Sequence, residues 1–205
     1  MEASCIVLAG GKSLRLGRDK VLEAFGNESL LQQVISCVSL LSSDIILVVA
    51  NNRSVPEYTG YPKLKVVTDI YPGKGPLGGI YSGLAASASF YNLVVAADMP
   101  FLNQALLRYM IQISTNFDLV VPRMGRLVEP LHAIYTKSCL IPIERMIKQD
   151  ILRIDLLFDQ VKVRYVETEE IERFDPKHLS FFNVNTKADL EKAKKIAGEL
   201  NDDQY

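Results

Sequence analysis

Short runs of apolar, mostly β-branched residues recur along the chain and predict strands. They are CIVLA (5–9), IILVVA (45–50), KVVT (65–68), LVVAA (93–97) and DLVVP (118–122). None of them alternates polar and apolar positions, a pattern typical of strands that are buried on both faces of a sheet.

Between these runs the apolar positions follow helical spacing. In residues 30–41 they fall at 30, 31, 34, 35, 38 and 41, which predicts a helix capped near Asn27. Strands that alternate with helices predict an α/β fold with three layers: a mostly parallel, Rossmann-like sheet with helices on both faces. Ligands of such sheets bind at the carboxyl ends of the strands.

The second half of the chain has a less regular pattern. RLVEPLHAIY (126–135) predicts a strand that Pro130 interrupts, and therefore an edge strand or a bulge. A helix over about 138–149, a short helical stretch at LLFD, a strand over 161–167 and a helix over about 187–200 follow. No repeat or linker requires a boundary, so we expect one domain over 1–205.

Composition narrows the classes of partner. The 205 residues include 23 Lys and Arg against 24 Asp and Glu, so no overall field attracts nucleic acid or an anionic membrane. Cys5, Cys37 and Cys139 are odd in number and widely spaced, which predicts reduced, buried thiols with neither disulfides nor a zinc site. The first apolar run is too short for a signal peptide or a membrane span, so a cytoplasmic protein is expected.

The stretch VLAGGKSLRLGRDK (7–20) contains the triplet GKS but is not a P-loop, because the required glycine position holds Ile6. The dinucleotide fingerprint also fails, since Gly10 and Gly11 are adjacent. Two glycines after a buried strand let a ligand approach the main chain closely.

Four cations follow these glycines in the same stretch; Arg18, beside Asp19, is interpreted as a solvated surface charge, and the other three are Lys12, Arg15 and Lys20. They repel each other unless an anion joins them, and a triphosphate has the right charge. The alternative is a plain turn with solvated surface charges.

A second glycine-rich element, YPGKGPLGGIYSGL, spans residues 71–84. Pro76 suits the first turn of a helix, and Gly75, Gly78 and Gly79 leave the start of that helix bare enough for an anionic ligand. The alternative is that the glycines permit close helix packing.

Two carboxylates and two amides complete the candidate site. Asp98 follows LVVAA, where it can hold Mg²⁺ against phosphate oxygens, or form a turn before Met99. Asp69 follows KVVT and accepts from a base or ribose, or caps a turn. Asn183 and Asn185 share one face of an extended segment, where Asn185 or Thr186 could instead cap the next helix.

His132 and His178 are the two histidines, and neither has a Cys or carboxylate at the spacing of a metal site. His132 lies in a strand-like stretch and is interpreted as a packed, hydrogen-bonded core residue with no role in chemistry.

Taken in order, LAGGKSLRLGRDK, GPLGG, AADMPFL and NVNTKADL resemble the molybdenum cofactor guanylyltransferases, within the wider nucleotidyltransferase group. The resemblance spans nearly the whole chain, and Leu16 replaces a methionine of the family pattern. It implies a fold like that of the nucleotide-diphospho-sugar transferases and a magnesium-dependent transfer of GMP from GTP to the phosphate of molybdopterin.

The resemblance also assigns residues. Those expected to contact GTP are Leu8, Ala9, Gly10, Gly11, Lys12, Lys20, Asp69, Gly75, Gly78 and Asp98. Arg15, Lys20 and Asp98 are the expected catalytic residues, and Asp98 is the expected Mg²⁺ ligand. Asn183 and Asn185 are placed on the side of the pterin acceptor, or would help to hold metal and phosphate. The nucleotide-binding half is expected at about 1–122 and the acceptor-binding half at about 123–205.

One position departs from the family pattern: a nucleotide-contacting asparagine after the second strand aligns with Ala50, and Asn51 and Asn52 are displaced by one or two. The expected partners are GTP and molybdopterin, with a cofactor-delivery protein or an apoenzyme as a further candidate. The alternatives are a molybdopterin cytidylyltransferase, a nucleotidyltransferase with another phosphate acceptor, and a nucleotide-binding protein without turnover.

Overall fold

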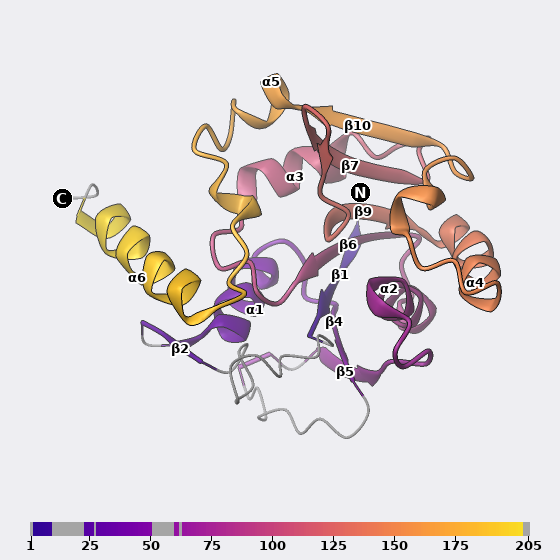
Figure 1. Cartoon of the computed structure of the whole chain (residues 1–205), viewed down its shortest axis with the longest axis horizontal. Helices are drawn as coiled ribbons and strands as arrows, with labels where there is room; N and C mark the ends of the chain where they lie inside the picture. The colour runs from indigo at the N-terminus through magenta and orange to yellow at the C-terminus, as the bar shows by residue number, and fades with distance from the viewer. Residues whose placement is uncertain (1, 10–22, 27, 51–59, 62, 203–205) are drawn as a thin grey trace.

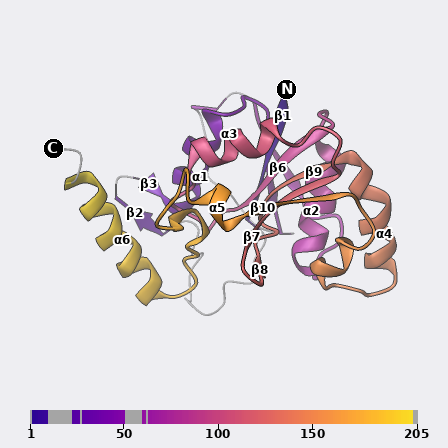
Figure 2. The ribbon, with the colours of Figure 1, turned by 90° about the horizontal axis from the view of Figure 1, so that it is seen from above.

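The computed structural model describes residues 2–9, 23–26, 28–50, 60–61 and 63–202. In it a mixed β-sheet lies between two layers of helices (Figure 1 and Figure 2). This is the α/β, three-layer architecture with a mostly parallel sheet that the sequence predicts.

Within the described residues the main sheet has eight strands in the order β10-β7-β9-β6-β1-β4-β5, with the short β8 paired to β7. Their bounds are β1 (Ala3–Leu8), β4 (Ile45–Val49), β5 (Leu64–Thr68), β6 (Tyr91–Ala96), β7 (Leu119–Met124), β8 (Leu127–Val128), β9 (His132–Thr136) and β10 (Val163–Glu167). β1 is parallel to both β4 and β6, and β10 is parallel to β7. β9 is antiparallel to both β6 and β7.

Helices cover both faces of this sheet. Their bounds are α1 (Leu30–Ser39), α2 (Gly75–Ala86), α3 (Gln104–Gln112), α4 (Leu140–Lys148), α5 (Thr168–Ile171) and α6 (Lys187–Asp202), with 3₁₀ helices η3 (Lys137–Cys139), η4 (Ile154–Leu157) and η5 (Leu179–Phe181). In Figure 1, α1 and α3 lie on one side of the sheet and α2 and α4 on the other. The small hairpin of β2 (Ala24–Phe25) and β3 (Glu28–Ser29) packs with α6.

The predicted helix over 30–41 is α1, but its cap differs from the prediction. Ser29 is the N-cap, because its hydroxyl accepts from the N–H of Gln32 at 3.2 Å and the Gln32 side chain accepts from the N–H of Ser29 at 2.8 Å. This reciprocal pair satisfies two amides that the helix start leaves free. Asn27 lies outside the described residues.

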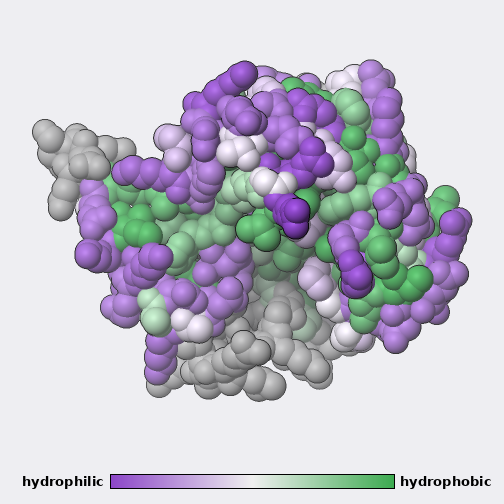
Figure 3. Space-filling model, turned by 45° about the horizontal axis from the view of Figure 1, so that its top comes forward, coloured by the Kyte–Doolittle hydropathy of each residue, from purple (hydrophilic) through white to green (hydrophobic). Residues whose placement is uncertain are grey.

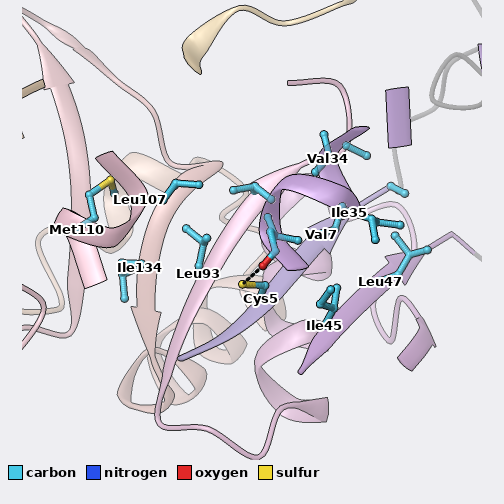
Figure 4. Close-up of a cluster of buried hydrophobic side chains, with 14 of the residues drawn as sticks. Cys5, Val7, Val34, Ile35, Ile45, Leu47, Leu93, Leu107, Met110 and Ile134 are labelled. Atoms are coloured by element: carbon cyan, nitrogen blue, oxygen red, sulfur yellow. Dashed lines mark hydrogen bonds between the residues drawn. The ribbon is translucent and has the colours of Figure 1, made fainter. Parts of the chain in front are cut away.

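The larger hydrophobic cluster joins β1, β4 and β6 to α1 and α3 (Figure 4). Cys5, Val7, Val34 and Ile35 meet there, and the Cys5 thiol donates to the carbonyl of Val38 at 3.8 Å. The second cluster lies on the opposite face, between the sheet and α2 and α4. Both faces of the central strands are therefore covered, which explains why their sequences are continuously apolar.

All three cysteines are free, as the sequence predicts. Cys5 and Cys139 are buried and Cys37 is only partly buried, so the expectation of buried thiols holds for two of the three. Burial raises the pKa of Cys5 and of Cys139 to about 12 and that of Cys37 to about 11, so the thiols stay protonated and poorly reactive at neutral pH.

Two strands differ from their predicted environment. KVVT forms the edge strand β5, and Lys65, Val66 and Thr68 on it are exposed, so this strand is not buried on both faces. The predicted strand over 126–135 is two strands, β8 and β9, and β9 lies inside the sheet. Pro130 precedes β9 in a connecting turn, where its missing N–H costs no ladder hydrogen bond.

Hydrophobic side chains reach the surface in patches among hydrophilic ones, one toward α6 and one toward α4 (Figure 3). Ile141 in α4 is exposed. None of the described helices is both long enough and apolar enough to cross a membrane.

Helix α2 lies unusually close to the central strand because glycines face the sheet. A methyl group on Gly83 would stand 2.4 Å from Cγ2 of Ile6, and one on Gly79 would stand 3.3 Å from Cδ2 of Leu8. Ile6 is fully buried in β1, so it has no room to move away.

We predict that Gly83→Ala lowers the free energy of unfolding by about 1–3 kcal/mol, because overpacking against Ile6 exceeds the gain in helix propensity. Gly198→Ala is the matched control, since Gly198 is exposed in α6 and an added methyl there meets nothing within 4 Å. That variant should be as stable as the wild type or up to about 1 kcal/mol more stable. Urea unfolding of both variants provides the measurement, and equal stabilities would refute the packing argument.

His132 is fully buried at the start of β9, and its ring packs edge-on against Phe181 with 4.9 Å between ring centroids. Within the described part of the chain neither ring nitrogen has a hydrogen-bond partner, so His132 is a packed core residue but not the hydrogen-bonded one expected from the sequence. Burial lowers the pKa of His132 to about 4, although the nearby Asp175 carboxylate acts in the opposite direction.

This burial predicts a pH-dependent stability. The folded-state pKa lies below the unfolded value of about 6.5, so the unfolded chain binds more protons between the two values. His132 therefore does not lower the free energy of unfolding above about pH 6.5. As the pH drops toward 4, it lowers that free energy by up to about 3 kcal/mol. His132→Met should flatten this fall in urea unfolding curves.

His178→Asn is the control, because His178 lies partly exposed with φ of 53°, a conformation that asparagine tolerates. It should retain the wild-type pH dependence. A slope that disappears in His178→Asn but persists in His132→Met would contradict this account.

Candidate active site at the carboxyl edge of the sheet

The carboxyl ends of β1, β4, β5, β6, β7 and β10 lie at one edge of the sheet, because these strands run in the same direction. Ala9 follows β1, Asp69 follows β5 and Asp98 follows β6. The backbone joins these ends: the N–H of Ala9 donates to Val48 at 2.8 Å, and the N–H of Ala97 donates to Leu8 at 3.0 Å. The edge therefore brings together three of the positions predicted from the sequence.

Asp69 is tied into the turn that leads to α2. Its Oδ1 accepts from the N–H of Tyr71 and from the hydroxyl of Ser82, both at 3.0 Å. Its own N–H donates to the carbonyl of Val49 at 2.8 Å. The alternative of a turn-forming Asp69 is thus observed, and binding of a nucleoside stays a prediction.

The glycines at the start of α2 have structural reasons of their own. A methyl group on Gly78 would lie 2.7 Å from the carbonyl oxygen of Tyr71 and 3.1 Å from Oδ1 of Asp69. Gly75 has a φ of 63°, a backbone conformation that residues with a side chain rarely adopt. Pro76 occupies the first turn of the helix, as expected. Close packing therefore accounts for Gly78 and Gly79, and a role of Gly75 and Gly78 in binding GTP remains a prediction.

The segment containing Asn183 and Asn185 lies against the loop after β6. The N–H of Val184, between the two asparagines, donates to the carbonyl of Asp98 at 2.9 Å, and Val184 is buried. Residues far apart in sequence, Asp98 in one half and Asn183 to Asn185 in the other, thus meet at this edge.

Thr186 caps α6, as one of the sequence alternatives proposed. Its hydroxyl accepts from the N–H of Asp189 at 3.1 Å, while Oδ2 of Asp189 accepts from the N–H of Thr186 at 2.7 Å. The side chain of Asn183 donates to the carbonyl of Phe181 at 3.2 Å. Asn185 is exposed, and its N–H donates to Oδ2 of Asp189 at 3.0 Å.

Asp98 is the half-buried carboxylate at the centre of this edge. The described residues contain no group of three or more His, Cys, Asp and Glu side chains arranged to hold a metal ion. A single carboxylate suits Mg²⁺, which retains several waters and takes its other ligands from substrate phosphates.

The predicted phosphate-binding stretch cannot be placed. Gly10, Gly11, Lys12, Arg15 and Lys20 lie outside the described residues, as do Asn51 and Asn52. Ala50 is described and follows β4 at the same carboxyl edge.

Three further charged groups at this edge were not predicted. Arg123 in β7 pairs with Glu167 in β10, and its guanidinium lies 4.1 Å from the ring centroid of Tyr165. Glu129 follows β8 and is half-buried. The sequence signal for Glu129 was a carboxylate directly before Pro130. The place of Glu129 in the fold depends on the antiparallel strand β9, which the hydrophobic pattern did not reveal.

Comparison with known proteins agrees with this architecture. The family model for the MobA-like NTP transferase domain matches residues 5–161. A probable molybdenum cofactor guanylyltransferase from Pelotomaculum thermopropionicum is 36% identical over 197 residues, covering 96% of this chain and 94% of the relative. A molybdenum cofactor guanylyltransferase from Desulfosudis oleivorans is 34% identical and covers 92% and 93% of the two chains.

Among solved structures, the molybdopterin-guanine dinucleotide biosynthesis protein A from Archaeoglobus fulgidus superposes with a TM-score of 0.82 at 27% identity. The superposition covers 96% of this chain and 99% of that one. The family match and the relatives, both extending over most of the sequence, show that the chain belongs to the MobA-like NTP transferase family.

Proposed function

We propose that this protein transfers GMP from GTP to the terminal phosphate of molybdopterin, forming molybdopterin guanine dinucleotide and releasing pyrophosphate. The names of the two relatives as guanylyltransferases support the donor and the acceptor. The observation that carries the proposal is the contact between Val184 and Asp98, because it joins Asn183 and Asn185 to the end of β6.

The proposal divides the domain at about residue 122. The half over 1–122 supplies the ends of β1, β4, β5 and β6, where Leu8, Ala9, Asp69 and Asp98 would contact GTP. The half over 123–205 supplies Asn183 and Asn185 for the acceptor. A common edge between the two halves is what a reaction between two bound phosphates requires.

In the reaction, an oxygen of the acceptor phosphate attacks the α-phosphorus of GTP, and the bond to the β-phosphate breaks as pyrophosphate leaves. The acceptor phosphate is already anionic, so a strong general base is not required. This is consistent with a buried His132 that has no catalytic part. Arg15 and Lys20 would neutralise the phosphates and the developing charge.

Asp98 would hold Mg²⁺, and the residue fits the ion because a half-buried carboxylate at the end of a strand can supply one oxygen ligand while phosphate oxygens and water supply the others. When bound there, Mg²⁺ supplies charge neutralisation at the α-phosphate and the leaving pyrophosphate. The three free thiols suit a reducing compartment, and we propose a cytoplasmic enzyme that receives or passes on its pterin through a partner protein.

The direct test is an incubation with GTP, Mg²⁺ and molybdopterin, followed by mass detection of the dinucleotide and measurement of pyrophosphate. A parallel incubation with CTP addresses the cytidylyltransferase alternative, and GTP with other phosphorylated acceptors addresses a different acceptor. GTP binding without pyrophosphate release with any acceptor would identify a nucleotide-binding protein and contradict the proposal.

We predict that Asp98→Asn lowers kcat/KM by about 100-fold or more and raises the Mg²⁺ concentration needed for half-maximal rate, because an amide lacks the carboxylate charge. Asp159→Asn is a matched control at an exposed aspartate and should behave as the wild type. Initial rates across a Mg²⁺ titration provide the measurement. A near wild-type rate of Asp98→Asn at limiting Mg²⁺ would remove the metal assignment.

A further inference from the structure

Glu129 lies at the carboxyl edge of the sheet, near the ends of β6 and β7. In the antiparallel pair of β6 and β9, Val95 is opposite His132, and the next bond joins the N–H of Ala96 to the carbonyl of Leu131 at 3.1 Å. Beyond this bond the ladder ends, because the N–H of His132 donates to the carbonyl of Glu129 at 3.1 Å and closes a turn two residues from Leu131. The chain bends there, because the N–H of Glu129 donates to the carbonyl of Pro122 in β7 at 3.1 Å.

This position is on the acceptor side of Asp98. The strands β1, β4 and β5, which lead to the proposed nucleoside contacts, follow β6 on one side in the sheet order. Glu129 stands on the other side, between the ends of β6 and β7. A ligand of Glu129 would therefore approach Asp98 from the direction opposite to the nucleoside.

The Glu129 carboxylate differs from the other carboxylates at this edge. Glu167 is paired with Arg123, and Asp69 accepts from Tyr71 and Ser82. Within the described residues no hydrogen bond or ion pair reaches the Glu129 side chain, and burial alone raises its pKa. A half-buried carboxylate that accepts no hydrogen bond lowers the stability of the fold. A ligand that donates hydrogen bonds to Glu129 would explain why a carboxylate stands at this position.

The chemistry of a carboxylate selects the ligand. Two oxygens in one plane match two adjacent N–H donors, as in bidentate pairs with guanidinium. A 2-amino-4-oxopyrimidine ring has such an edge, made of its ring N–H and its exocyclic amine. Guanine and pterin both carry this edge, and the place of Glu129 on the acceptor side favours the pterin.

We propose that Glu129 binds the 2-amino-4-oxopyrimidine edge of the pterin acceptor and thereby selects that acceptor. The proposal rests on the proposed function. Glu129 is a specificity residue at a distance from the reacting phosphate, so its loss weakens acceptor binding more than the chemical step.

The test compares Glu129→Gln with the wild type in GTP-dependent pyrophosphate release. KM for molybdopterin should rise by about 10- to 100-fold, since a charged hydrogen-bond acceptor is lost, while kcat, KM for GTP and the preference for GTP over CTP stay unchanged. Glu169→Gln is the control, because Glu169 is exposed in α5 and removes the same charge. Glu129→Gln should melt at the same temperature as the wild type or higher, whereas a structural role predicts a lower one.

A second arm uses the wild-type protein alone. 6-Hydroxymethylpterin should inhibit transfer more strongly than the corresponding lumazine, in which an oxygen replaces the 2-amino group. Equal inhibition by the two compounds would overturn the proposal even if the variant failed to fold.

The outcomes separate the two hypotheses. A wild-type protein that transfers no GMP to molybdopterin contradicts the proposed function. An active wild type with an unchanged acceptor KM in Glu129→Gln overturns the inference alone. A change confined to KM for GTP or to the GTP preference assigns Glu129 to guanine and also overturns it.

Discussion

The close approach of α2 to the central strand β1 is the constraint on which the candidate site depends. Gly83 faces Ile6 at a distance that leaves no space for a side chain, and Gly79 faces Leu8 at a distance where an added methyl group would fit only if Leu8 shifted. The same helix places Gly78 beneath the carboxylate of Asp69, and Ser82 donates to that carboxylate. A larger residue on this face would push the helix outward and move the turn after β5, because packed interiors have few voids to absorb the change.

Ser82 shows how tightly the turn is fixed. Its buried hydroxyl accepts from the N–H of Ile70 at 2.8 Å and lies 2.7 Å from the carbonyl of Gly78. Farther out, the hydroxyl of Tyr71 donates to Glu144 in α4 at 3.2 Å, and Lys74 pairs with Asp150 at 2.8 Å. The exposed ion pair contributes little energy, but the two links join the turn to the second half of the chain. Contacts with α2 and α4 thus fix the turn after β5, where Asp69 is proposed to contact the nucleoside.

The second organising feature is the antiparallel strand β9 between β6 and β7. By entering the sheet there, it places the second half of the chain directly beside the end of β6. As a result, the loop after β8 reaches the end of β6 through the bond between Leu131 and Ala96, and the segment of Asn183 to Asn185 reaches Asp98. Joining two halves around one carboxylate suits an enzyme that must align two anionic substrates, since orientation replaces a costly bimolecular encounter.

The hydrophobic pattern by itself determined the fold class, because strands buried on both faces require helices above and below them. It located the five strands that the first half contributes to the main sheet, and most later elements, to within about two residues. The position of Asp69 and Asp98 after strands put them at one edge. The short hairpin of β2 and β3, and helices α3 and α5, were not predicted.

What only the tertiary structure decided concerns neighbours that are distant in sequence. The insertion of β9 and the edge position of β5 both depend on which segments pair. The sequence could not reveal that Glu129 lies near the end of β6 or that Gly83 faces Ile6, because such neighbours follow from strand order and helix approach. Local periodicity records whether a residue is buried, but the partner that buries it is set by the packing of the whole chain.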